Sequence, residues 1–124
     1  MTFEPKAIMP VLRVKDIDAA IEFYTGVLGF RLAWRKPADG GGENCLLAWG
    51  TAELMLSTGL HLGGPPSLTG TLYFNGSDVG SLYERIKGHV MVIWPLADME
   101  YGTREFGIRD VDGYTLAFAE ELPE

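Results

Sequence analysis

The sequence predicts an α+β fold built from two βαβββ modules. Two observations lead to this prediction: strand-like and helix-like spacings follow each other in the same order twice, and a Gly- and Pro-rich connector separates the two runs. With 124 residues, 47% of them hydrophobic, the chain can bury one core but is short for two independent domains. We expect a single domain over residues 1–124, with module one at about 5–58, a connector at about 59–70 and module two at about 71–121.

Module one opens with a strand and a helix. Residues 7–14 alternate as a strand does, and the stretch after them changes to helical spacing. Asp16 is the expected N-cap of this helix, and Gly26 or Gly29 is its expected end. Three strands then follow, the last two joined in a hairpin at Gly50-Thr51, and they are expected at 30–35, 44–50 and 52–58.

Module two repeats this order. Its elements are expected as a strand at 71–76, a helix at 77–88 and strands at 89–94, 103–110 and 114–121. A shift of 62 residues (16 to 78) brings Asp16 onto Asp78 and Leu56 onto Phe118. Literal identities at this shift are no more frequent than chance, so the repeat rests on element order and on matching apolar and turn positions.

The composition narrows the possible partners. A net charge of −7 argues against nucleic acid, and it suits either a cationic ligand or ordinary solubility. No apolar run approaches the roughly 20 residues that span a membrane, and the N-terminal residues lack the plan of a signal peptide. Because Cys45 is the only cysteine, no internal disulfide can form, and we expect a cytoplasmic protein with neither membrane nor nucleic-acid partners.

Each sheet is expected to have one face that its helix covers and a second face that lies on the concave side. The purely apolar alternating sets are expected to pack on the helices, and the sets with polar members should line the concave side. These concave positions are Arg13, Glu53 and Ser57 in module one, and Thr71, Tyr73, Asn75, Thr115, Ala117 and Ala119 in module two.

The segments "VLRVKDIDAAIEFYTGVLGFRLAW" and "YGTREFGIRDVDGYTLAF" resemble the vicinal oxygen chelate superfamily of glyoxalases, bleomycin resistance proteins and dioxygenases. The resemblance covers essentially the whole chain and implies the glyoxalase/bleomycin-resistance fold, in which the two βαβββ modules form a curved, half-open mixed sheet with an active site in its cup. In metal-using members of the superfamily, His and Glu side chains on the cup strands hold a divalent cation. The resemblance places those ligand positions at Met9, Met55, Thr71 and Ala117.

These four residues do not suit a hard divalent cation. Such ions take carboxylate oxygen or imidazole nitrogen, whereas thioether sulfur is soft, a threonine hydroxyl is a weak donor and alanine has no donor. His61 lies in the connector and His89 follows the second helix, so neither is expected on the concave face. We therefore expect no metal and no other cofactor.

The segment "YGTREFGIRDVDG" resembles the W-G-x-R-E-F-x-x-R-D-P-x-G segment of the bleomycin-resistance branch, with Tyr101 at the tryptophan position and Val111 at the proline position. Members of that branch sequester a cationic drug at a homodimer interface without changing it, which implies a homodimer here. Arg104 and Glu105 are interpreted as a surface ion pair or as cross-strand partners. The candidate ligand-binding residues are Met9, Arg13, Trp34, Glu53, Met55, Tyr73, Trp94, Tyr101, Thr115 and Ala117.

The preferred hypothesis is a metal-free small-molecule-binding protein whose ligand is a cationic or aromatic antibiotic. The alternative is a lyase, isomerase or dioxygenase of the same superfamily that has relocated its metal or works without one. In that case Glu53 is the candidate acid or base, because alternation places it on the concave face beside the methionines. A third alternative is an accessory module that acts through its dimer surface.

Overall fold

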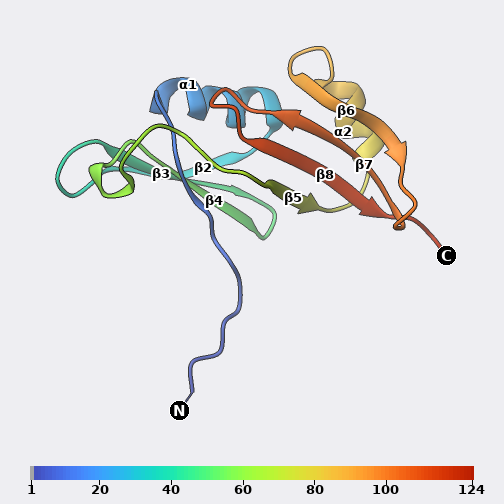
Figure 1. The fold of residues 1–124 in the computed structure, drawn as a ribbon, viewed down its shortest axis with the longest axis horizontal. Coiled ribbons are helices and arrows are strands. Elements are labelled where there is room, and N and C mark those ends of the chain that lie inside the picture. The colour runs from blue at the N-terminus through green and yellow to red at the C-terminus, as the bar shows by residue number, and fades with distance from the viewer. Residues whose placement is uncertain (1) are drawn as a thin grey trace. The chain divides into compact units, whose positions relative to one another are not determined.

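The computed structural model describes residues 2–124, and the chain divides between Pro65 and Pro66 into two compact units. Each unit contains one mixed four-stranded sheet and its own helix (Figure 1). The predicted α+β class with two βαβββ modules is therefore confirmed. No helix within residues 2–124 is both long and apolar enough to cross a membrane.

In module one the sheet has the strand order β1-β4-β3-β2, with β1 parallel to β4 and the other neighbours antiparallel. The hairpin between β3 and β4 turns at Gly50, whose φ of 59° suits glycine. The elements are β1 (Val11–Arg13), α1 (Ile17–Glu22), the π-helical turn η1 (Phe23–Leu28), β2 (Arg31–Pro37), β3 (Glu43–Trp49) and β4 (Ala52–Ser57).

The first strand is shorter than the predicted 7–14. Only Val11–Arg13 pairs with β4, and Pro10 contributes one further bond by accepting from the Met55 amide at 2.9 Å. Proline has no amide hydrogen, so Pro10 cannot donate to a neighbouring strand. The segment before it is exposed and leaves the sheet as an extended chain (blue in Figure 1).

The first helix begins as predicted and ends at the second of the two expected glycines. Asp16 Oδ1 accepts hydrogen bonds from the backbone amides of Asp18 at 3.0 Å and Ala19 at 3.2 Å, which is the N-cap arrangement. The last turn widens into a π-helix that closes at Gly29, where φ is 114°. Only glycine adopts that backbone conformation without strain.

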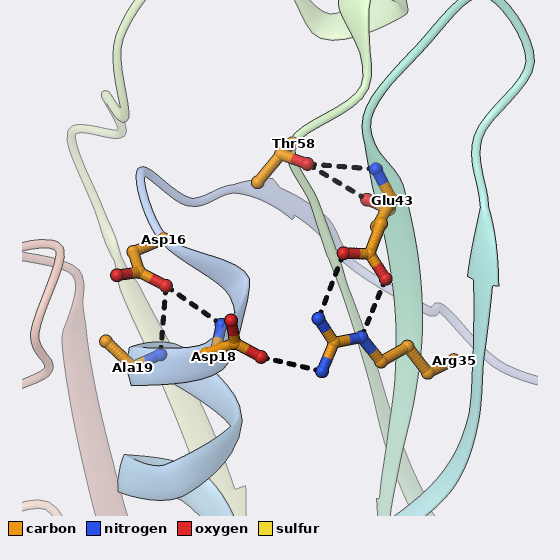
Figure 2. A network of polar contacts seen from close by, with 6 residues as sticks. All are labelled: Asp16, Asp18, Ala19, Arg35, Glu43 and Thr58. Carbon is orange, nitrogen blue, oxygen red and sulfur yellow. Dashed lines mark hydrogen bonds and ion pairs between the residues drawn. The ribbon is translucent and has the colours of Figure 1, made fainter.

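An ion network joins the start of α1 to the sheet of module one (Figure 2). The Arg35 guanidinium donates to both carboxylate oxygens of Glu43 at 2.7 and 2.9 Å and to Asp18 at 2.7 Å. Hydrogen bonding by Glu43 and then Asp18 raises the pKa of Arg35, and Arg35 in turn lowers the pKa of Glu43. Arg35 therefore lies on the helix side of β2.

In module two the strand order is β5-β8-β7-β6, with β5 parallel to β8. The predicted second strand of this module, 89–94, is instead Met91–Asp98, because two irregularities in the register let Ala97 and Asp98 continue the pairing with β7. The elements are β5 (Thr71–Asn75), α2 (Val79–Ile86), β6 (Met91–Asp98), β7 (Thr103–Arg109) and β8 (Thr115–Glu121); the connector contains one short 3₁₀ turn, η2 (Leu60–Leu62).

The second helix begins differently from the first. Asp78, the counterpart of Asp16, has a left-handed φ of 57° and its side chain makes no capping bond. The Val79 amide instead donates to Glu120 Oε1 at 3.3 Å, so a carboxylate from β8 lies at this helix N-terminus.

Each helix covers one face of its own sheet, in contact with β3 and β4 in module one and with β7 and β8 in module two. Large buried apolar residues lie on these covered faces and on the helices packed against them, as the alternation predicts. They include Leu12, Tyr24, Leu28, Leu47, Leu54 and Leu56 in module one, and Val79, Ile86, Phe106, Ile108, Leu116 and Phe118 in module two. We call the opposite face of each sheet its open face.

Candidate ligand-binding site

The open face of module two brings together side chains from all four of its strands. Cross-strand pairing places Tyr73 beside Ala117, Ala117 beside Gly107, and Gly107 beside Trp94. Glu105 follows on the same face of β7, opposite Ala119. Because Gly107, Ala117 and Ala119 are small, the larger side chains around them define the surface.

Glu105 is the centre of this surface, and it is only 1% exposed. Its Oε2 accepts hydrogen bonds from the Tyr73 hydroxyl at 2.8 Å and the Trp94 indole at 3.1 Å. Its Oε1 accepts from the hydroxyls of Tyr101 at 2.8 Å and Thr103 at 2.7 Å. We name these five residues the Glu105 cluster.

The four donors keep the buried carboxylate charged. Burial raises the pKa of Glu105, but bonds from the three hydroxyls and the indole together outweigh it, so the pKa lies below its usual value. The pKa of the Tyr73 phenol is raised, first by Tyr101 and then by Glu105. Within residues 2–124, no lysine or arginine hydrogen-bonds or ion-pairs with Glu105. The cluster therefore holds an anion that has hydrogen bonds but no cationic partner.

Trp94 is held flat against β7 by the absence of a side chain at Gly107. A Cβ atom at that position would lie 2.5 Å from three atoms of the indole ring, which is well inside van der Waals contact. One face of the ring thus covers the strand while its Nε1 reaches Glu105. Gly107 is required by this close approach, since its φ is not in the left-handed region.

Two aromatic rings of the cluster remain open. Tyr73 is 46% exposed and Tyr101 is 66% exposed, although both hydroxyls are bonded to the buried carboxylate. Their hydroxyl ends are fixed and their rings are accessible, which is an arrangement suited to stacking on a ligand.

A hollow of about 650 Å³ lies at the end of this sheet, where Thr103 of the cluster forms part of its lining. Its volume falls in the range of small-molecule pockets. Thr103 links the two features, because it lines the hollow and donates to Glu105. The hollow has two carboxylates and no basic residue in its lining, which consists of Asn75, Gly76, Ser77, Thr103, Ala119, Glu120 and Glu121.

The remaining candidate residues of module two lie on the open face as well. Ala117 is fully buried at the centre of the sheet, and Thr115 is half-buried beside the exposed Thr71. Thus the structure brings Tyr73, Trp94 and Tyr101 into one hydrogen-bonded cluster, with Ala117 beside it.

The candidate residues of module one share the open face of the other sheet. Met55 pairs with Leu46, which also pairs with Trp34, and the ring of Trp34 lies under the Lys36 ammonium at 4.8 Å. These contacts leave Trp34 with a cation already on its ring.

The polar candidates of module one, Arg13 and Glu53, lie on the neighbouring strands β1 and β4. The Arg13 guanidinium donates to the Gly59 carbonyl at 2.6 Å, so it fastens the connector. Glu53 is exposed on β4, where water solvates its carboxylate, and Met9 is 40% exposed just before β1.

The side chains at the expected metal positions differ from the His and Glu ligands of the metal-using members of the superfamily. Among residues 2–124, no group of three or more His, Cys, Asp and Glu side chains is placed to hold a metal ion. Ala117 has no donor, and the nearby Glu105 already accepts two hydrogen bonds on each oxygen. The chemistry of these side chains therefore supplies no binding site for a hard divalent cation.

The sequence interpretation missed the role of Glu105. Arg104 does form an exposed ion pair with Asp98 at 2.7 Å, as expected. Glu105 is buried, so its interpretation as part of a surface ion pair is wrong, whereas its bond to Trp94 on β6 does make it a cross-strand partner. Alternation along β7 contains the missing signal, because Glu105 and Gly107 interleave with the buried Phe106 and Ile108 and so must face the other way.

Comparisons with known proteins agree with the fold described above. The family model described as "Glyoxalase/Bleomycin resistance protein/Dioxygenase superfamily" matches residues 7–118. Among solved structures, TioX from Micromonospora sp. ML1 is 27% identical, with a TM-score of 0.77 over 95% of this chain and 100% of that one. A glyoxalase/bleomycin resistance protein from Streptomyces sp. CB03234 is 25% identical, with a TM-score of 0.74 over 89% of this chain and 96% of that one.

A further similar structure is TnmS3 from Streptomyces sp. CB03234, described as an antibiotic binding protein. It is 22% identical, with a TM-score of 0.78 over 98% of this chain and 99% of that one, and this likeness shows the fold alone. The comparison with curated proteins gives no match.

Proposed function

Because the chain belongs to the glyoxalase/bleomycin resistance protein/dioxygenase superfamily, we propose that it is a metal-free protein whose function is to bind a small molecule. One observation carries the proposal: the family's metal positions hold residues without suitable donors, while the Glu105 cluster presents ordered aromatic rings beside a hollow of ligand size. A largely apolar surface with a few directed polar groups is the usual construction of a small-molecule site.

We further propose that the ligand is a cationic or aromatic antibiotic, held in a homodimer as in the bleomycin-resistance branch. The net charge of −7 and the two exposed tyrosine rings support this ligand class. The similar fold of an antibiotic binding protein agrees with it. In this proposal the module-one residues Met9, Arg13, Trp34, Glu53 and Met55 form a ligand-binding surface of their own, on the open face of that module.

Titration with metal-free bleomycin, followed by tryptophan fluorescence, tests the drug assignment. We expect a saturable change in the native protein, and a smaller change in a Trp94→Phe variant, which keeps an aromatic ring but removes the indole of the cluster. No change with micromolar protein and ligand would eliminate this drug as the ligand.

Elemental analysis of protein purified without chelators tests the metal-free assignment. The donor set predicts less than stoichiometric zinc, iron, manganese and nickel. One equivalent of any of these metals, retained through gel filtration, would overturn the proposal and favour the alternative of an enzyme.

A further inference from the structure

We infer that the Glu105 cluster is a subsite for a fully alkylated ammonium group, so that the ligand is recognised by its positive charge and not by hydrogen bonding. This inference rests on the proposed ligand-binding function and specifies the chemistry of one part of the ligand. Three features of module two support it: an anion without a counter-ion, rings that are polarised by that anion, and the absence of spare acceptor sites.

The first feature is the electrostatic field of Glu105. Glu105 is 1% exposed, and among residues 2–124 its carboxylate is bonded only to neutral groups, so its field is screened weakly by water and is not cancelled by a contacting cation of that range. Arg109 shares the open face of β7, but it lies four residues further along the strand, roughly 13 Å away. Glu121, in the lining of the adjoining hollow, adds to the negative potential.

The second feature is the orientation of the aromatic groups. Tyr73, Trp94 and Tyr101 each donate their polar hydrogen to the carboxylate. Such a bond draws positive charge toward Glu105 and leaves the rings richer in electrons, because hydrogen-bonded groups polarise one another. A cation over the rings gains from both the ring quadrupole and the anion behind it.

The third feature decides between kinds of cation. An ionised carboxylate has about four lone-pair sites, and Glu105 already accepts four hydrogen bonds, two on each oxygen. A primary ammonium or a guanidinium that lost its water here would find no free acceptor on Glu105. A trimethylammonium group has no hydrogen to satisfy, so it loses little by leaving water and gains the full electrostatic attraction.

A pair of isosteric probes tests the inference: choline, and its neutral carbon analogue 3,3-dimethyl-1-butanol. Binding is followed by two-dimensional NMR through the indole N–H resonance of Trp94, which reports directly on the cluster. We expect choline to shift this resonance saturably and to bind about tenfold more tightly than the neutral analogue. Ethanolamine, the primary-ammonium analogue, should bind more weakly than choline.

Two outcomes overturn the inference. Equal affinity for choline and the neutral analogue would show that charge is not recognised, while the binding function would stand. No shift with either probe at the highest soluble concentration would show that the cluster is not this subsite. Bleomycin binding measured on the same sample separates both outcomes from failure of the proposed function.

Variants identify the groups responsible. Glu105→Gln should lower the affinity for choline about tenfold and leave the affinity for the neutral analogue unchanged. Glu100→Gln makes the same charge change at an exposed neighbour of Tyr101 and should have little effect on either affinity.

Variants of Tyr101 test the contribution of its ring. Because Tyr101 is exposed, these variants are expected to fold. Tyr101→Leu should lower choline affinity about threefold and Tyr101→Phe should largely retain it, since only the ring faces the cation. Equal affinities for choline in Glu105→Gln and native protein would contradict the inference.

Discussion

At the scale of single residues, the open face of module two depends on a buried carboxylate and on a glycine two positions further along the same strand. Glu105 accepts four hydrogen bonds, and Gly107 leaves the space in which Trp94 lies. Neither residue contributes apolar burial comparable to that of the core. Both residues set the arrangement of the aromatic rings on this face, on which the proposed binding function depends.

Replacing Gly107 with alanine is expected to displace the Trp94 ring, because the new methyl group would lie 2.5 Å from it. Overpacking of this kind typically costs 1–3 kcal/mol, and we expect about 2 kcal/mol here by urea denaturation, together with a changed tryptophan emission. Gly88→Ala is the matched control, since a Cβ there meets nothing within 4 Å. Equal stability of the two variants would contradict the described packing.

Replacing Glu105 with glutamine should destabilise the protein in a pH-dependent way. The pKa of Glu105 is lowered in the folded state, so its charge contributes stability that is fully present above the unfolded value of about 4.3 and is lost as pH falls through the folded pKa. We expect a loss of about 2 kcal/mol at pH 7 that shrinks below about pH 4.

Urea denaturation of both proteins across this pH range provides the measurement. Glu100→Gln, at an exposed position, should match the native protein at every pH. A stability difference for Glu105→Gln that stays constant down to pH 3 would mean that the carboxylate charge does not act as described.

At the scale of elements, the two helices occupy equivalent places in their modules but begin in different ways. Asp16 caps α1 with its own side chain, whereas Asp78 has a left-handed backbone and α2 receives Glu120 from β8. Local residue preferences account for the first helix start. The second depends on a contact between residues 41 positions apart, which no local pattern reveals.

The two aspartates should therefore respond differently to mutation. Asp16→Ala removes two capping bonds and is expected to lower the free energy of unfolding by about 1 kcal/mol. Asp78→Gly removes no capping bond and relieves a positive φ, so it should leave stability unchanged or raise it by up to about 1 kcal/mol. Thermal and urea denaturation of both variants measure these effects; a larger loss for Asp78→Gly than for Asp16→Ala would refute this account of the helix starts.

At the scale of the whole molecule, two modules of similar element order have open faces of different character. Module two has the aromatic and acidic Glu105 cluster, while in module one Lys36 lies over Trp34 and Arg13 bonds to the connector. The described chain also exposes large apolar side chains: Phe3 and Ile8 are 90% and 92% exposed. Exposed side chains of this size are candidates for burial against a second copy of the chain.

We predict that the protein is a homodimer in solution. Analytical ultracentrifugation at micromolar concentration should give twice the mass of one chain. Phe3→Ser with Ile8→Ser should weaken the dimer, since burial of each apolar side chain is worth about 1.5–3 kcal/mol. A mass equal to one chain at all concentrations tested would contradict this prediction.

The sequence by itself determined the α+β class, the twofold βαβββ order, the Asp16 cap and the covered faces of both sheets, because alternation and capping depend on residues close together in the chain. It also showed that Met9, Met55, Thr71 and Ala117 are poor metal ligands, because that conclusion needs only residue chemistry. Only the tertiary structure decided that Glu105 is buried and that Tyr73, Trp94 and Tyr101 converge on it. Those residues come from three different strands and a turn, and sheet pairing alone sets which of them meet.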